Sequence, residues 1–197
     1  MKTLIVYAHP NRESLNGAFL EAVRKGIRAG GTGEEVQVLD LYQEAFNPVL
    51  VYNKEKRRRD MHRDPETEKY RAQLLWAERI VMIYPIFWGR PPAMLLGYID
   101  RLFSSNFAYR DLPNRIYPEG LLKGKSVVCI STMKGPAGYI RLTLNNAHKV
   151  LMKRALFRFV GIRKVKFFEF GSMESPKGGH NRKLEKVRRY FAGGTGA

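Results

Sequence analysis

The sequence of 197 residues predicts an α/β domain, a three-layer sandwich in which helices cover both faces of a parallel sheet. Two observations carry this prediction. Short apolar runs rich in β-branched residues alternate along the chain with longer segments whose apolar residues recur at helical spacing. The length also suits one domain with a substantial core, and 44% hydrophobic with 27% charged residues is typical of globular proteins.

The individual elements follow from these patterns. Strands are expected at residues 2–8, 35–41, 79–85, 125–132 and 165–170, and helices at 14–29, 65–77, 93–103, 141–159 and 182–191. Residues 104–124 are expected to form a long loop. The helix predicted at 141–159 has apolar residues on more than one face, so part of it could pack in a dimer interface, or its apolar stripe could be entirely core.

The alternation of strands and helices implies right-handed crossovers. Five strands fit the doubly wound order 2-1-3-4-5, in which ligands bind beyond the carboxyl ends of the strands, at the switch point between the first and third. That rule selects three loops, at residues 8–16, 85–92 and 132–139. We expect a single domain over residues 1–192 and a flexible tail at 193–197.

Several function classes are disfavoured. The single cysteine, Cys129, lies in an apolar run, which predicts a core residue and no disulfide within the chain. No apolar run is long enough to cross a bilayer, and the N-terminus turns polar too soon for a signal peptide, so a cytoplasmic location is expected. The net charge is +17. Its densest run, residues 54–63, lacks interleaved aromatic residues, which favours an exposed face or an anion-attracting rim over nucleic-acid binding.

The first loop leads from a buried strand to the start of a helix. Ser14 or Asn11 could cap that helix. Exposed backbone N–H groups and the helix dipole then favour an anion such as a phosphate. The alternative is an ordinary capped helix.

The second and third loops carry aromatic and charged residues. Phe87 and Trp88 could line a flat aromatic ligand, or they could simply cap the core. Lys134 could stabilise negative charge that develops on a ligand ring, or it could be a surface lysine. No pattern of metal ligands is evident.

Three motifs in order resemble the NAD(P)H:quinone oxidoreductase family of flavoproteins, which has a flavodoxin-like fold. They are Ala8-His9-Pro10 with Ser14-Leu15-Asn16, the aromatic-Pro-x-x-Trp turn at Tyr84–Trp88 with the helix that follows it, and Asn106-Phe107-Ala108-Tyr109. The resemblance extends over residues 2–175.

The resemblance implies a bound FMN, with FAD as the alternative, a homodimer, and ping-pong reduction of quinones by NAD(P)H. The residues implied to hold the flavin are His9, Ser14, Leu15 and Asn16 at its phosphate arm, Pro85, Ile86, Phe87, Trp88 and Gly89 at its ring, and Thr132, Gly135 and Tyr139 at its pyrimidine edge. Phe107 and Tyr109 are implied to wall the substrate pocket from the partner subunit. A regulatory flavoprotein subunit that binds a transporter, such as a potassium efflux system, is the alternative function.

The sequence departs from the family pattern at the third loop. Met133-Lys134 stands where the family often has glycines. Tyr139 matches a tyrosine that assists hydride transfer, but Asn145 occupies the position of its partner histidine. His148, three residues on, is expected to face solvent or an interface, and Lys134 is expected to assist Tyr139 in catalysis. The long C-terminal extension of the mammalian enzyme is missing, which favours FMN over FAD.

Overall fold

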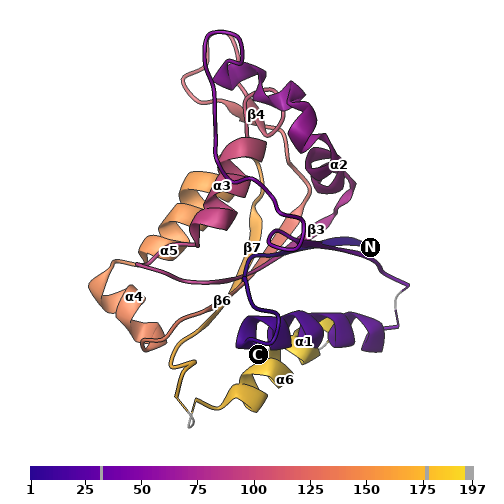
Figure 1. The fold of residues 1–197 in the computed structure, drawn as a ribbon, viewed down its shortest axis with the longest axis vertical. Coiled ribbons are helices and arrows are strands. Elements are labelled where there is room, and N and C mark those ends of the chain that lie inside the picture. Colours follow the sequence, from indigo (N-terminus) through magenta and orange to yellow (C-terminus); the bar gives the residue numbers. More distant parts are fainter. Residues whose placement is uncertain (32, 176–177, 194–197) are drawn as a thin grey trace.

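Five parallel strands form the central sheet in the computed structural model, which describes residues 1–31, 33–175 and 178–193 (Figure 1). The strands are β1 (Lys2–Tyr7), β2 (Glu35–Asp40), β3 (Arg79–Pro85), β6 (Ser126–Thr132) and β7 (Lys164–Phe170). Their order is β2-β1-β3-β6-β7, which confirms the predicted order 2-1-3-4-5. Cys129 on β6 is fully buried, as predicted.

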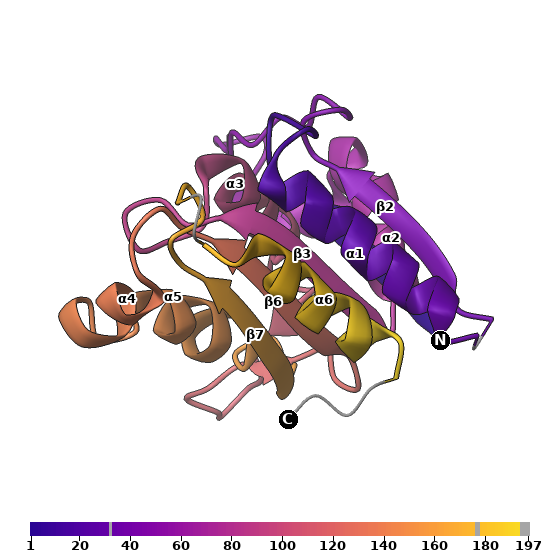
Figure 2. The same ribbon diagram turned by 90° about the horizontal axis from the view of Figure 1, so that it is seen from below.

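Helices cover both faces of the sheet. α1 (Leu15–Ala29) and α6 (His180–Phe191) lie side by side on one face (Figure 2). The other face carries α2 (Glu68–Trp76), α3 (Ala93–Leu102), the short α5 (Ala147–Lys149) and the π-helix η3 (Val150–Phe157). Each face encloses its own apolar core, so the inner strands are buried on both sides and read as continuous apolar runs.

The continuous helix predicted at 141–159 is wrong. The chain forms α4 (Ala137–Thr143), breaks, and resumes at α5 and η3. At the break, Asn145 and Asn146 have φ angles of 49° and 57°. Asparagine enters this left-handed region more easily than most residues, because its short amide can bond to nearby backbone. The break turns the chain so that His148 faces the sheet.

The long loop at 104–124 contains an antiparallel ladder that the sequence analysis missed. β4 (Tyr109–Arg110) pairs with β5 (Glu119–Gly120). Another difference lies in the helix predicted at 65–77, whose first residues form the 3₁₀-helix η2 (Pro65–Thr67) ahead of α2.

The basic run at 54–63 is mostly exposed, and its second half forms the 3₁₀-helix η1 (Arg58–Arg63). Met61 anchors it in the core, and Lys56 pairs with the buried Asp64 at 2.9 Å. This exposure fits both alternatives, an exposed face and an anion-attracting rim. The tail predicted at 193–197 lies, apart from Gly193, outside the described residues. Among the residues described, no helix has the length and apolarity that crossing a bilayer requires.

Candidate functional site

The three loops selected from the sequence meet at the carboxyl edge of the sheet. β1 and β3 are in register with Tyr7 beside Ile83, and β3 and β6 end together with Pro85 beside Thr132. The Ile86 N–H donates to the Thr132 carbonyl at 2.8 Å, so the second and third loops begin in direct contact.

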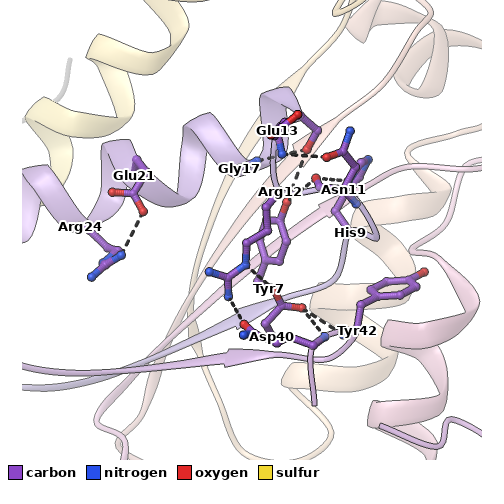
Figure 3. Close-up of polar contacts among 12 residues, drawn as sticks. Tyr7, His9, Asn11, Arg12, Glu13, Gly17, Glu21, Arg24, Asp40 and Tyr42 are labelled. Atoms are coloured by element: carbon purple, nitrogen blue, oxygen red, sulfur yellow. Dashed lines mark hydrogen bonds and ion pairs between the residues drawn. The ribbon is translucent and has the colours of Figure 1, made fainter. Parts of the chain in front are cut away.

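The first loop is held by hydrogen bonds within itself (Figure 3). The Ser14 side chain caps α1 by accepting from the Gly17 N–H at 3.3 Å. The Tyr7 hydroxyl donates to the Asn11 carbonyl at 3.0 Å, and the Asn11 side chain accepts from the Glu13 N–H at 2.8 Å. Ser14 is therefore the helix cap, and Asn11 instead stabilises the turn before it.

Arg12 ties this loop to the neighbouring strand. Its Nε donates to Asp40 Oδ2 at 2.6 Å, and its Nη2 donates to Gln43 Oε1 at 2.8 Å (Figure 3). Asp40 is the last residue of β2 and also accepts from the Tyr42 N–H. This tether was not predicted from the sequence. Its signal was the acid at the end of the strand predicted to lie next to the first.

Gly17 allows the loop to pack directly on α1. A Cβ at this position would lie 1.8 Å from the Arg12 carbonyl oxygen. Backbone at that distance excludes every other residue, so the close approach of loop and helix depends on this glycine.

The start of α1 is suited to an anion. The helix has 15 residues and no acid in its first turn. Within the described residues, the backbone N–H groups of Leu15 and Asn16 donate to no backbone acceptor, as helix geometry requires of its first residues. In the loop before the helix, His9 Nδ1 lies 2.8 Å from the Asn11 carbonyl oxygen.

Asn16 points differently from its neighbours. Its side chain is buried, and its Nδ2 donates to Thr132 Oγ1 at 2.9 Å. The side chain therefore joins the first loop to the third, and only the backbone N–H of Asn16 remains for a ligand.

The second loop presents aromatic rings to solvent. Phe87 and Arg90 exchange N–H···O bonds of 2.9 and 3.0 Å around a two-residue turn. Trp88 and Gly89 occupy the turn with φ angles of 53° and 75°, a conformation that costs a tryptophan about 1–3 kcal/mol. Trp88 is 93% exposed and Phe87 is also exposed, whereas Pro85 and Ile86 are buried beneath them.

The third loop is open. Thr132 is buried at its start, and Gly135 has so much space that a Cβ would meet nothing within 4 Å. Tyr139, on α4, is 53% exposed. The Lys134 side chain is 81% exposed and pairs with Glu174 at 3.0 Å. Lys134 thus lies on the rim of the third loop and is turned toward another surface residue.

Phe107 and Tyr109 lie at the opposite end of the sheet from these loops. They follow α3, and the Ala108 carbonyl between them accepts from the Leu121 N–H. Tyr109 packs on Phe159, with ring centroids 4.9 Å apart. Within one chain, these two residues are not brought to the other predicted site residues.

The expectation that His148 faces solvent or an interface is wrong. Its side chain has no exposed surface. Nε2 is 2.8 Å from the Tyr84 hydroxyl, and Nδ1 is 2.7 Å from Glu169 Oε1. Both partners are distant in sequence, so no local pattern around His148 could have indicated this burial.

The residues at this edge fit a flavin mononucleotide. A phosphate needs N–H donors and positive potential, which the start of α1 offers. A flat ring system needs aromatic or apolar walls, which Trp88 and Phe87 offer. The space above Gly135 leaves room for the ring edge.

Two curated relatives and a solved structure are similar to this chain. Over 109 residues it is 36% identical to the uncharacterized NAD(P)H oxidoreductase YcaK of Escherichia coli (strain K12), covering 54% of this chain and 55% of that protein. Over 156 residues it is 33% identical to the ribosyldihydronicotinamide dehydrogenase [quinone] of Pongo abelii, covering 69% of this chain and 64% of that protein. The matches thus span about half to two thirds of the length of these relatives.

The crystal structure of Smu.1420 from Streptococcus mutans UA159 superposes with a TM-score of 0.89 at 36% identity, covering 98% of this chain and 100% of that one. The model of the family described by its flavodoxin-like fold matches residues 1–192. This match and the strand order agree, and the chain belongs to the flavodoxin-like fold family.

Proposed function

We propose that this chain is a flavin-dependent NAD(P)H oxidoreductase that reduces quinones or related two-electron acceptors. The observation that carries the proposal is the meeting of a capped helix start and an exposed aromatic turn at one edge of the sheet. The names of the two similar proteins, an NAD(P)H oxidoreductase and a dehydrogenase of quinones, support both the nicotinamide donor and the quinone acceptor.

In this proposal, the first loop binds the phosphate arm of FMN, with FAD as the alternative. The N–H groups of Leu15 and Asn16, the Ser14 hydroxyl and the His9 ring are its donors. Arg12 does not contact the ligand, because it is engaged with Asp40; it holds the loop in place.

The second and third loops orient the ring. Trp88 and Phe87 provide the wall, and the backbone from Pro85 to Gly89 provides polar groups for the ring edge. Thr132, Gly135 and Tyr139 border the pyrimidine side. A bound flavin supplies the hydride chemistry, and the protein positions it and excludes competing reactions.

Tyr139 and Lys134 are the proposed catalytic residues. The Tyr139 hydroxyl is placed to donate a hydrogen bond at the exposed end of the third loop. The Lys134 ammonium would stabilise negative charge there after it leaves Glu174. Phe107 and Tyr109 can wall this pocket only from a second copy of the chain, so the proposal includes a homodimer.

The test is cofactor identification followed by turnover. The purified protein, reconstituted with FMN or FAD, should hold a flavin whose mass identifies it. NADPH or NADH should bleach the visible absorbance under anaerobic conditions, and menadione should restore it. Double-reciprocal plots of initial rate against nucleotide concentration, at several menadione concentrations, should be parallel lines. The reason is that the oxidised nucleotide leaves before the quinone binds.

Reduced ribosylnicotinamide is a second donor to assay, since one relative is named for it. A chain that takes up neither flavin and oxidises none of these donors with menadione would overturn the proposal.

A further inference from the structure

A chain of polar contacts lies behind the Phe87–Arg90 turn. It runs from the Tyr84 hydroxyl to His148 Nε2 at 2.8 Å and from His148 Nδ1 to Glu169 Oε1 at 2.7 Å. Glu169 Oε2 is then 2.6 Å from Lys149 Nζ. Tyr84 and His148 have no exposed surface. Buried polar groups are costly unless paired, so a fully paired chain of this length fixes the relative positions of its members.

The direction of the hydrogen bond between His148 and Glu169 follows from the surroundings. Burial raises the pKa of Tyr84 well above its usual value, so its hydroxyl stays protonated beside His148 Nε2. Burial alone would raise the pKa of Glu169, but the hydrogen bond from His148 and the contact with Lys149 outweigh burial and lower it. The Glu169 carboxylate therefore accepts from His148 Nδ1–H.

The same contacts join two segments of the proposed ring site. Tyr84 immediately precedes Pro85, where the second loop begins. His148 follows the break after α4, the helix that carries Tyr139. On the outer side, the Leu144 side chain lies against Gly89, where a Cβ would come within 2.9 Å of Leu144 Cδ1.

Among the described residues, five side chains from three strands and one helix lie around His148 or contact its direct partners. Tyr84 faces His148 from β3, and Cys129 on β6 is near Tyr84. Glu169 and the Phe167 ring face it from β7, with the Phe167 and His148 centroids 5.7 Å apart. Lys149, on the same helix as His148, completes the set through Glu169.

We propose that His148 is a positioning residue: through Tyr84 it sets the spacing between the Pro85–Gly89 segment and α4, and so determines how tightly this edge closes on a flavin ring. The inference rests on the proposed function. His148 acts through Tyr84 and has no surface with which to contact a ligand.

The test measures FMN affinity of the apoprotein by quenching of FMN fluorescence, together with the melting temperature of the apoprotein. The variants are Tyr84→Phe, which removes only the hydroxyl, His148→Gln, and the double variant. Each single variant should weaken FMN binding about tenfold. The double variant should bind FMN no more weakly than the weaker-binding single variant, because both changes remove one shared contact.

Tyr98→Phe is the matched control. Tyr98 is also fully buried, and within the described part of the chain its hydroxyl has no hydrogen-bond partner. The FMN affinity of the Tyr98→Phe variant should stay within about twofold of that of the wild type, since the change removes no hydrogen bond. At Glu169, Gln keeps an oxygen that accepts from Nδ1–H and should largely preserve FMN affinity, whereas Ala should not.

The outcomes separate this inference from the proposed function. If the wild type binds FMN and Tyr84→Phe and His148→Gln bind it equally well while their melting temperatures fall, the network only stabilises the fold and the inference is wrong. If the wild type binds no flavin at all, the proposed function fails. Additive losses in the double variant would also overturn the inference.

Discussion

The loop after β1 and the loop after β6 border the same candidate site but differ in how much of their surface is exposed. The first is closed by its own hydrogen bonds, is tied to β2 through Arg12, and packs so tightly that Gly17 admits no side chain. The loop after β6 is exposed from Lys134 to Tyr139, and a Cβ on Gly135 would have open space, although the Gly135 carbonyl accepts from the Ser172 N–H at 2.9 Å. Under the proposed function, the first loop is a closed seat for the phosphate, and the exposed outer surface of the loop after β6 borders the ring.

The largest expected effect comes from adding one methyl group at Gly17, in the first turn of α1. Gly17→Ala places a Cβ against the Arg12 carbonyl and should destabilise the protein by about 3 kcal/mol, lowering the melting temperature by about 10 °C. FMN affinity should fall by about 100-fold, because the start of α1 shifts relative to the loop. Thermal melts and FMN titration measure both effects.

Gly135→Ala is the matched control, since nothing lies within 4 Å of the added Cβ. Its melting temperature should stay within about 1 °C of the wild type. Similar losses at the two glycines would show that the two loops do not differ as described.

A smaller effect is expected at the bond that links the two loops. Asn16→Ala leaves the buried Thr132 hydroxyl without its partner and should cost about 2 kcal/mol in the free energy of unfolding, measured with urea. Thr132→Ser keeps the hydroxyl and should cost less than half as much. An undiminished free energy in Asn16→Ala would mean that the loops are stabilised independently.

The helix cap should contribute less again. Ser14→Ala removes the acceptor for the Gly17 N–H and should cost about 1 kcal/mol, or about 3 °C in melting temperature. Ser14→Thr retains the hydroxyl and should recover most of the loss. If Ala and Thr behave alike, the hydroxyl does not stabilise α1.

Lys134→Ala should have the smallest effect on stability. Its pair with Glu174 is exposed on both sides, so the free energy of unfolding should change by less than about 0.5 kcal/mol. If the ammonium assists catalysis, the rate of flavin reduction by NADPH in stopped flow should still fall about tenfold. An unchanged rate would remove Lys134 from the proposed catalytic residues and leave Tyr139 alone.

The inner strands β1, β3 and β6 were predictable because strands buried on both faces are continuous apolar runs. The five predicted strands end within one residue of the observed ones. The helix at 141–159 was not predictable in the same way. Its apolar spacing is helical throughout, and the break at Asn145 and Asn146 brings His148 to partners that lie 64 and 21 residues away.

In the candidate site, too, local contacts were predictable from the sequence and contacts between distant residues were not. Ser14 was predictable because a helix cap depends on residues three positions away. The pairing of Arg12 with Asp40 depends on the order of the strands, which the sequence analysis had but did not use. The burial of Asn16 against Thr132 spans 116 residues and needs the assembled sheet.

Trp88 also makes the site directly visible to spectroscopy. The chain has two tryptophans, and Trp76 on α2 is partly buried whereas Trp88 stands almost entirely in water. An indole in water emits at longer wavelength than one packed in protein. The long-wavelength side of the emission band therefore comes mainly from Trp88. A flavin bound against that turn would absorb this light, and the intrinsic emission of the unlabelled protein would then report occupancy in real time.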